Sequence, residues 1–327
     1  MADTPDVLGA DPAVPSARLA HAGSGVVASG VRRSFGDVEA VRGIDLTAAP
    51  GEVTALVGPN GAGKTTLLLV LATLLVPDAG DVRVAGFDPV TESDAVRARM
   101  GWSPDVFGLY DNLTAREYLR FVGEAYRLGA ATSARRAVEL LELIRLLDHA
   151  DRPVHTLSRG QKQRLGLARA LVHDPEVLLL DEPASGLDPR SRVELRDLLR
   201  RLARSGTAVV VSSHLLGDLE ELADRVVFVD GGRTVGEHRI DALPTTGRSS
   251  RAWRVRALDP AALLAALERH GSPHDDPTPT GVDVHLPSDD AAAALLAALV
   301  GDGVPVVAFS PHGGALEAAY LELTEER

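Results

Sequence analysis

Short apolar runs separated by turn residues dominate the first third of the chain. From Val26 to Gly58 the runs are short and β-branched, and Gly and Asp residues interrupt them, which predicts an antiparallel patch of strands. The last run, "EVTALV", leads into a glycine-rich turn and then into the apolar segment "LLLVLATLLV". We therefore expect a buried strand, a tight turn and the start of a helix, in that order.

The pattern changes to helical spacing in residues 112–151. Apolar residues there recur with charged residues between them, which predicts a helical subdomain inserted into an α/β core. Farther along, the apolar runs "EVLLLDEP" and "TAVVVSSH" flank the amphipathic segment "SRVELRDLLRRLARSG". A strand, a helix and a second strand in this order are typical of a parallel crossover, so we expect a parallel-sheet core.

A cluster of Pro, Gly, Ser and Thr in "DALPTTGRSSR" indicates a domain boundary. We expect a flexible tail at residues 1–25, a main domain at 26–240 and a small accessory domain at 249–327. In the last of these the pattern reads strand, helix, strand, helix, strand and a final helix, which predicts an α+β domain.

Composition and charge narrow the possible functions. The 327 residues are 45% hydrophobic, enough for a large core, and contain no cysteine, which excludes disulfides and thiolate metal sites. No apolar stretch reaches the roughly 18 residues that span a bilayer, and no secretory signal precedes the fold, so we expect a cytoplasmic chain. The formal net charge of −12 disfavours a nucleic-acid partner.

The turn after "EVTALV" fits the pattern G-x-x-x-x-G-K-[ST] from Gly58 to Thr65. Glycines let several backbone N–H groups point into one nest, and the helix N-terminus adds a favourable dipole for phosphate. Lys64 is expected to reach the β- and γ-phosphates and Thr65 to ligate Mg²⁺, whereas the alternative is a glycine-rich connection without a ligand. The expected contacts with ATP in this segment come from Gly58, Asn60, Gly61, Gly63, Lys64, Thr65 and Thr66.

Two adjacent carboxylates, Asp181 and Glu182, end the apolar run "EVLLL". Open α/β sheets bind ligands at the carboxyl ends of their strands, and an unpaired buried charge is costly, so a purely structural role is the weaker interpretation. We expect Asp181 to hold the Mg²⁺ shell and Glu182 to orient or deprotonate the water that attacks the γ-phosphate.

The segment "TLSRGQKQRLGLARAL" resembles the signature motif of ATP-binding cassette (ABC) ATPases. Together with "GPNGAGKTT", the Asp-Glu strand and "VSSH", the resemblance covers Val26 to Arg239 in the order of that family. It implies a P-loop cassette with a mixed sheet, an antiparallel patch and an inserted helical subdomain, which binds and hydrolyses ATP with Mg²⁺. Arg159 stands where the commonest form of the signature has glycine.

The resemblance also implies a homodimer in which two cassettes close head to tail around two ATP molecules. Ser158, Gly160 and Gln161 are then expected to face the ATP bound by the opposite subunit. Asp188 resembles the loop residue that communicates across the dimer, and His214 resembles the switch histidine at the γ-phosphate. Ordinary helix capping, by Ser158 with Gln161 and by Asp188, is the alternative interpretation.

Two further positions take their expected roles from the same resemblance. Phe35 lies where the family places an aromatic ring against adenine, with core packing as the rival role. Asp105 stands where a glutamine normally contacts the metal and the attacking water, so a metal contact there would be made by a shorter, charged side chain.

We expect this chain to serve an exporter, pairing with a separately encoded membrane permease at the inner face of the membrane. The ending "SPHGGALEAAYLELTEE" resembles the branch that exports drugs, antibiotics and other hydrophobic compounds, similar to daunorubicin-resistance ATPases. Two alternatives are a soluble ABC ATPase acting on nucleic acid or the ribosome, and a regulatory module that binds ATP without hydrolysing it.

Overall fold

The computed structural model describes residues 25–105, 108–213, 216–242 and 251–311, together with residues 316 and 323. The chain forms two compact units. The larger contains residues up to 214 and residues 221–237, and the smaller contains residues 215–220 and those from 238 onward.

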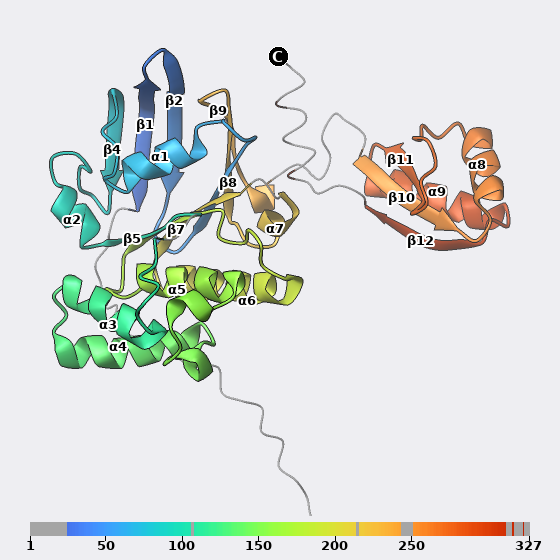
Figure 1. The fold of residues 1–327 in the computed structure, drawn as a ribbon. Coiled ribbons are helices and arrows are strands. Elements are labelled where there is room, and N and C mark those ends of the chain that lie inside the picture. The colour runs from blue at the N-terminus through green and yellow to red at the C-terminus, as the bar shows by residue number, and fades with distance from the viewer. Residues whose placement is uncertain are drawn as a thin grey trace, which may run out of the picture. The chain divides into compact units, whose positions relative to one another are not determined.

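The larger unit is built on a nine-stranded sheet with the strand order β4-β1-β2-β9-β8-β3-β7-β6-β5 (Figure 1). Its strands are β1 (Val26–Phe35), β2 (Val38–Ala48), β3 (Val53–Val57), β4 (Ala79–Val84), β5 (Met100–Ser103), β6 (Val177–Asp181), β7 (Ala208–Ser213), β8 (Arg225–Asp230) and β9 (Arg233–Arg239).

The sheet is mixed, as the sequence predicts. β1 pairs antiparallel with both β2 and β4, which form the antiparallel patch. β3 pairs parallel with β7 and β8, and β6 pairs parallel with β5 and β7. Every residue of β3 and β6 is buried, because parallel strands in the middle of a sheet are covered on both faces. The α/β fold class is therefore confirmed.

Six helices accompany this sheet within the described part of the larger unit: α1 (Lys64–Leu71), α2 (Ser93–Arg97), α3 (Ala115–Ala125), α4 (Ala130–Leu143), α5 (Arg159–Ala170) and α6 (Pro189–Arg204). α1 contacts β2 and β4 on one side and β6 on the other, so it joins the two parts of the sheet. Its last five residues are all apolar, and four of them, Leu67, Leu68, Val70 and Leu71, are buried against the sheet. α6 packs on β3 and β7.

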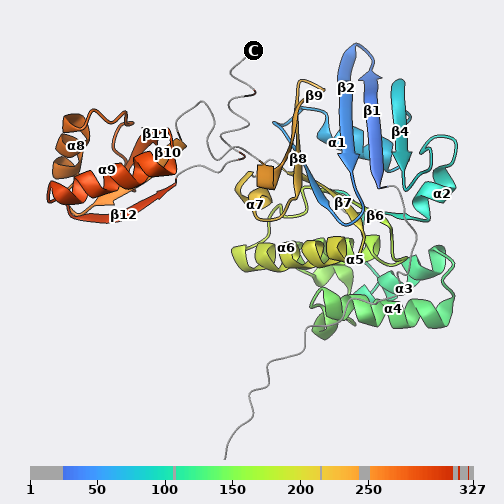
Figure 2. The same cartoon turned by 180° about the vertical axis from the view of Figure 1, so that it is seen from behind.

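The inserted helices lie beside α5. α3 and α4 pack against each other and both contact α5, away from the antiparallel patch (Figures 1 and 2). They fall inside residues 112–151, where the sequence predicts a helical subdomain. Short 3-10 helices, Leu147–His149 and Val154–Thr156, return the chain to the start of α5.

The smaller unit has a three-stranded antiparallel sheet with the order β11-β10-β12. Its strands and helices follow the predicted order: β10 (Arg251–Ala257), α8 (Pro260–Arg269), β11 (Val282–Leu286), α9 (Asp289–Gly301) and β12 (Val306–Pro311). Apolar residues of α8, α9 and the sheet form a separate core, which includes Leu263, Leu299 and Val284. The final predicted helix lies outside the described residues, apart from positions 316 and 323. The short helix α7 (Leu216–Glu220) belongs to this unit.

Across the described ranges, no helix combines the length and the apolar character that crossing a membrane requires.

Candidate functional site

The loop between β3 and α1 has a backbone that requires glycine. A Cβ atom on Gly58 would lie 2.0 Å from the carbonyl oxygen of Val229, closer than atoms can approach. Gly63 has a φ of 98°, and a Cβ there would lie 2.7 Å from the carbonyl oxygen of Ala40. Gly61 also has a positive φ, of 84°. The loop therefore curls closely against the sheet, as a phosphate-binding nest must.

Lys64 lies at the centre of this loop and is only 7% exposed. Its Nζ donates hydrogen bonds to the carbonyl oxygens of Gly58, at 2.6 Å, and Pro59, at 3.1 Å. An ammonium group has three donors, so one remains for an anion in the loop. Burial lowers the pKa of Lys64, while the carboxylates of Glu182 and Asp181 act in the opposite direction.

Thr65 and Asp181 meet at the carboxyl edge of the sheet. The Thr65 hydroxyl donates to Asp181 Oδ2 at 2.9 Å, and the Ser212 hydroxyl donates to Asp181 Oδ1 at 2.5 Å. Mg²⁺ takes oxygen ligands, and it commonly takes only one or two from protein, with substrate phosphates and water completing the shell. The hydroxyl and the carboxylate fit such an ion. Among the described residues, no group of three or more His, Asp or Glu side chains could hold a metal alone.

Glu182 has a left-handed backbone, with a φ of 48°, which is unusual for a residue other than glycine. Its N–H donates to both the carbonyl oxygen and the hydroxyl of Ser212, each at 3.2 Å. These bonds stabilise the left-handed turn at Glu182, directly after Asp181. Ser212 is thus a site residue that the sequence reasoning missed. It pairs with Asp181 in the register of β6 and β7.

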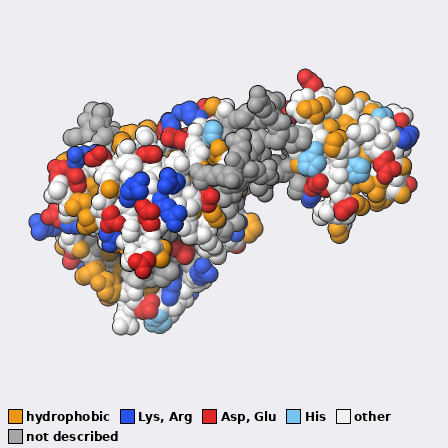
Figure 3. Space-filling model, turned by 90° about the horizontal axis from the view of Figure 1, so that it is seen from above, with side chains coloured by type: hydrophobic (Ala, Val, Ile, Leu, Met, Phe, Trp, Pro, Cys, Tyr) orange, Lys and Arg blue, Asp and Glu red, His pale blue; other side chains and the backbone are white. Residues whose placement is uncertain are grey.

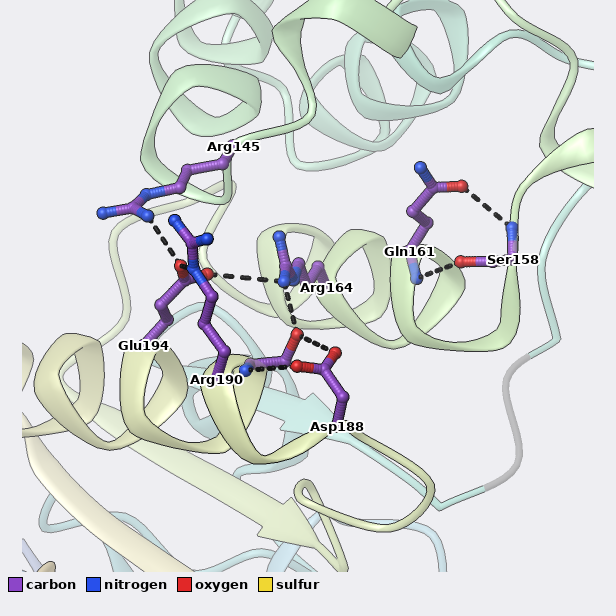
Figure 4. Close-up of polar contacts among 8 residues, drawn as sticks. Arg145, Ser158, Gln161, Arg164, Asp188, Arg190 and Glu194 are labelled. Carbon is purple, nitrogen blue, oxygen red and sulfur yellow. Dashed lines mark hydrogen bonds and ion pairs between the residues drawn. The ribbon is translucent and has the colours of Figure 1, made fainter.

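A second group of predicted residues gathers at the start of α5. The hydroxyl of Ser158 accepts a hydrogen bond from the Gln161 N–H at 3.3 Å, and Gln161 Oε1 accepts one from the Ser158 N–H at 2.9 Å (Figure 4). This reciprocal pair is a capping box. A Cβ on Gly160 would lie 3.4 Å from Leu187, an ordinary contact distance, so α5 lies beside the chain before Asp188. Arg159 Nη2 donates to Ser185 Oγ at 3.4 Å.

Asp188 caps α6, with Pro189 at the first helical position. Its Oδ1 accepts from the Ser191 N–H at 3.0 Å and its Oδ2 from the Ser191 hydroxyl at 2.5 Å. Hydrogen bonds from the Ser191 hydroxyl and, to a smaller extent, from the Ser191 N–H lower the pKa of the Asp188 carboxyl. The capping interpretations of Ser158 and Asp188 are therefore correct, and both remain compatible with a second role.

Other predicted residues lie apart from these groups. Phe35 is 47% exposed at the end of β1, with the Arg33 guanidinium 5.1 Å from its ring centroid. Asp105 is exposed two residues beyond β5 and lines a hollow with Arg159 and Lys162. Within the described contacts, neither Phe35 nor Asp105 joins the cluster around Lys64 and Asp181. The remaining predicted residues are Asn60, which is exposed, Thr66, which is half-buried, and His214, which lies outside the described residues.

A glycine loop between a buried parallel strand and a helix, with a lysine in the loop and a threonine–aspartate pair beside it, defines a P-loop nucleotide-binding protein. A sequence profile of the ABC transporter family matches residues 41–185. The chain is 44% identical over 222 residues to the daunorubicin resistance ATP-binding protein DrrA3 of Streptomyces coeruleorubidus, covering 68% of this chain and 70% of the relative.

A second relative matches nearly the whole chain. The daunorubicin/doxorubicin resistance ATP-binding protein DrrA of Streptomyces peucetius is 35% identical over 301 residues, which are 90% of this chain and 91% of the relative. A solved dimeric ATP-binding cassette in a post-hydrolysis state, bound to ADP and Pi, superposes with a TM-score of 0.61 at 27% identity. The match covers 66% of this chain and 98% of that structure. The chain belongs to the ABC transporter family of ATP-binding proteins.

Proposed function

We propose that this protein hydrolyses ATP to drive an ABC exporter of a drug, an antibiotic or another hydrophobic compound. The observation that carries the proposal is the hydrogen-bonded chain from Thr65 through Asp181 and Ser212 to the backbone of Glu182. It brings the two oxygen ligands that suit Mg²⁺ next to a second carboxylate, at the edge of the sheet where the glycine loop opens.

Each residue of this cluster has a distinct role in the proposal. The loop N–H groups and Lys64 bind the phosphates, and Thr65 and Asp181 hold the ion. When bound, Mg²⁺ would neutralise part of the negative charge on the phosphates. Glu182 orients or deprotonates the attacking water, and His214 contacts the γ-phosphate. Phe35 is exposed enough to stack on the adenine ring.

The second half of the site comes from a second copy of the chain. Ser158, Gly160 and Gln161 lie at the N-terminus of α5, where backbone N–H groups and the helix dipole favour an anion. In a head-to-tail homodimer this terminus and the Asp188 loop would enclose the γ-phosphate bound by Lys64 of the partner subunit. The dimeric ADP-bound cassette with a similar fold supports this arrangement.

Export by way of a separate permease rests on the relatives. Both carry names that describe an ATP-binding protein of drug resistance, and one of them matches 90% of this chain, including the smaller unit. We infer a cytoplasmic subunit that binds the inner face of a membrane permease. Acidic and basic side chains are interspersed over the larger unit on the face that Figure 3 shows, and the net charge is −12, which supports a protein partner over a nucleic acid.

The proposal is tested by ATPase assays at several protein concentrations, together with size-exclusion chromatography in ATP. We expect the wild-type rate to rise more steeply than linearly with protein concentration. The Glu182→Gln variant should lose turnover by a factor on the order of 10² to 10⁴, because it lacks the carboxylate that would orient or deprotonate the attacking water. It should also elute as a dimer only when ATP is present.

A chain that stays monomeric and inert in ATP, alone and with its permease, contradicts the proposal. The Asp105→Gln variant separates two causes of an inert chain, which are a site that does not assemble and a site that Asp105 disables. Recovery of turnover in that variant would show that the site assembles and that Asp105 prevents hydrolysis in the wild-type chain.

A further inference from the structure

A buried serine joins two elements of the site that lie far apart in the sequence. The Ser191 hydroxyl donates to Asp188 Oδ2 at 2.5 Å and accepts from Arg164 Nη2 at 2.6 Å (Figure 4). Ser191 is only 5% exposed, so water competes little for these contacts. Arg164 lies in α5, whose N-terminal cap is Ser158. The Asp188 loop is therefore tied directly to the helix that carries Ser158.

Glu194, one turn farther along α6, extends this connection to the helical subdomain. Its Oε2 lies 3.3 Å from Arg164 Nη2, and its Oε1 accepts a hydrogen bond from Arg145 Nη1 at 2.6 Å (Figure 4). Arg145 follows the end of α4 in a left-handed conformation, with a φ of 57°. The side chain of Glu194 is 23% exposed. One carboxylate thus joins α6, α5 and the end of α4.

A pocket of about 80 Å³, partly open to solvent, lies beside this network. Apolar residues of all three elements line it, including Leu143, Leu167 and Leu195. The pocket shows that the three elements do not close completely over one another here. The polar contacts of Arg164 and Glu194 connect the elements across this gap.

We propose that Arg164 and Ser191 are positioning residues that hold the start of α5 and the Asp188 loop in one arrangement. Glu194 and Arg145 extend that arrangement to the helical subdomain. The inference rests on the proposed function, because Ser158 and Asp188 affect catalysis only if the ATP of the partner subunit lies against them. Because the start of α5 and the Asp188 loop are connected, both would reach that ATP together, and dimer closure would be a single step.

The outer end of this network contributes little to stability. The side chain of Arg145 is 65% exposed, and exposed ion pairs contribute little to the free energy of unfolding. Arg190 provides a matched control. It also lies 3.3 Å from Glu194 Oε1, but it comes from the same helix, and its side chain is 84% exposed. Removing Arg190 takes a positive charge from Glu194 without cutting the connection between elements.

The test compares Arg164→Met, Ser191→Ala and the double variant with Arg190→Gln. We expect Arg164→Met to lower kcat about tenfold, while the Kd of the monomer for ATP stays within about twofold, because the loop around Lys64 is untouched. The double variant should be no slower than the slower single variant, since both remove the same connection. Arg190→Gln should match wild type, and Arg164→Lys, which keeps the charge, should recover part of the rate.

A second readout does not depend on turnover. In a Glu182→Gln background, Arg164→Met should weaken ATP-dependent dimerisation about tenfold, measured by analytical ultracentrifugation. The inference is overturned if Arg164→Met behaves like Arg190→Gln in both assays, or if its loss of rate only follows a loss of folded protein. Failure of the proposed function gives a different result, in which wild type and Arg190→Gln also neither dimerise nor hydrolyse ATP.

Discussion

The two halves of the candidate site differ in how much of their chemistry is buried. The phosphate cluster, made of residues 58–65 with Asp181, Glu182 and Ser212, has Lys64 and Asp181 only 7% and 4% exposed. The signature surface, made of Ser158, Gly160, Gln161 and Asp188, has exposed residues at both of its helix caps.

This difference indicates that folding organises one half of the site, whereas the other half needs a second subunit. Polar groups of the phosphate cluster are held by strands β3, β6 and β7, which neighbour one another in the sheet, so folding alone organises them. The helix caps of the signature surface are held by their own first turns and by Ser191. They are complete as caps before any second copy arrives. Only a partner subunit would give them a nucleotide, as we propose.

Two lysines, one from each half of the site, should differ most in their effect on the rate. Lys64→Ala removes a buried ammonium from the glycine loop, and we expect ATP hydrolysis to fall by a factor on the order of 10² to 10³. Lys162→Ala removes a lysine near the signature surface, 31% exposed and 3.6 Å from Asp111, and should change the rate less than about threefold. Steady-state ATPase rates and ATP titrations of both variants provide the measurement.

Equal losses in the two lysine variants would contradict the division into a buried and an exposed half. Loss of ATP binding in Lys162→Ala alone would reverse it. Circular dichroism of both variants confirms that each remains folded before the rates are compared.

Ser212 belongs to the phosphate cluster, and its only proposed role is to position the turn that carries Asp181 and Glu182. Ser212→Ala removes the hydroxyl that donates to Asp181 and accepts from the Glu182 N–H. We expect kcat to fall about tenfold and the Mg²⁺ concentration for half-maximal rate to rise, with the free energy of unfolding lowered by about 1–2 kcal/mol. Magnesium titrations of the ATPase rate test this.

Ser205→Ala serves as the control for Ser212→Ala. It removes a hydroxyl that donates to the carbonyl oxygen of Leu202 at the end of α6, away from the carboxylates. An unchanged Mg²⁺ dependence in Ser212→Ala, with a loss of stability alone, would show that Ser212 is merely structural.

The sequence predicts the phosphate cluster well because its information is local. A buried strand, a glycine loop and a helix follow one another between Val53 and Leu71, and the spacing of Gly58, Lys64 and Thr65 defines the loop. The capping box at the start of α5 is equally local, since Ser158 and Gln161 are three residues apart. Such features can be predicted without knowing how the elements pack.

Contacts between distant elements are what the sequence does not reveal. Ser212 and Asp181 are 31 residues apart, and only the register of β6 and β7 brings them together. Arg145 and Glu194 are 49 residues apart, and in the sequence each resembles an ordinary charged residue on a helix surface. Their meeting depends on where α4 ends relative to α6, which no periodicity specifies.

The smallest expected effect concerns the stability of the fold in acid. It depends on His173, which lies outside the phosphate cluster and the signature surface. The ring of His173 stacks on Tyr126, with centroids 3.8 Å apart, and its Nε2 donates to the carbonyl oxygen of Met100 at 3.1 Å. Burial lowers the pKa of His173 to about 4, with Arg136 acting in the same direction and the Met100 carbonyl and Asp174 opposing. In the unfolded chain its pKa is about 6.5.

Between these two pKa values the unfolded chain binds the proton that the folded chain excludes. Stability from neutral His173 is therefore complete above about pH 6.5 and is lost as the pH falls toward about 4, by an amount on the order of 1–3 kcal/mol. His173→Gln keeps a donor for Met100 but does not titrate. Urea unfolding at pH 7.5 and pH 5 should thus show a smaller loss for the variant than for wild type. Equal losses would mean that other groups cause the acid sensitivity, whereas a change in ATP affinity at pH 7.5 would mean that His173 affects the site directly.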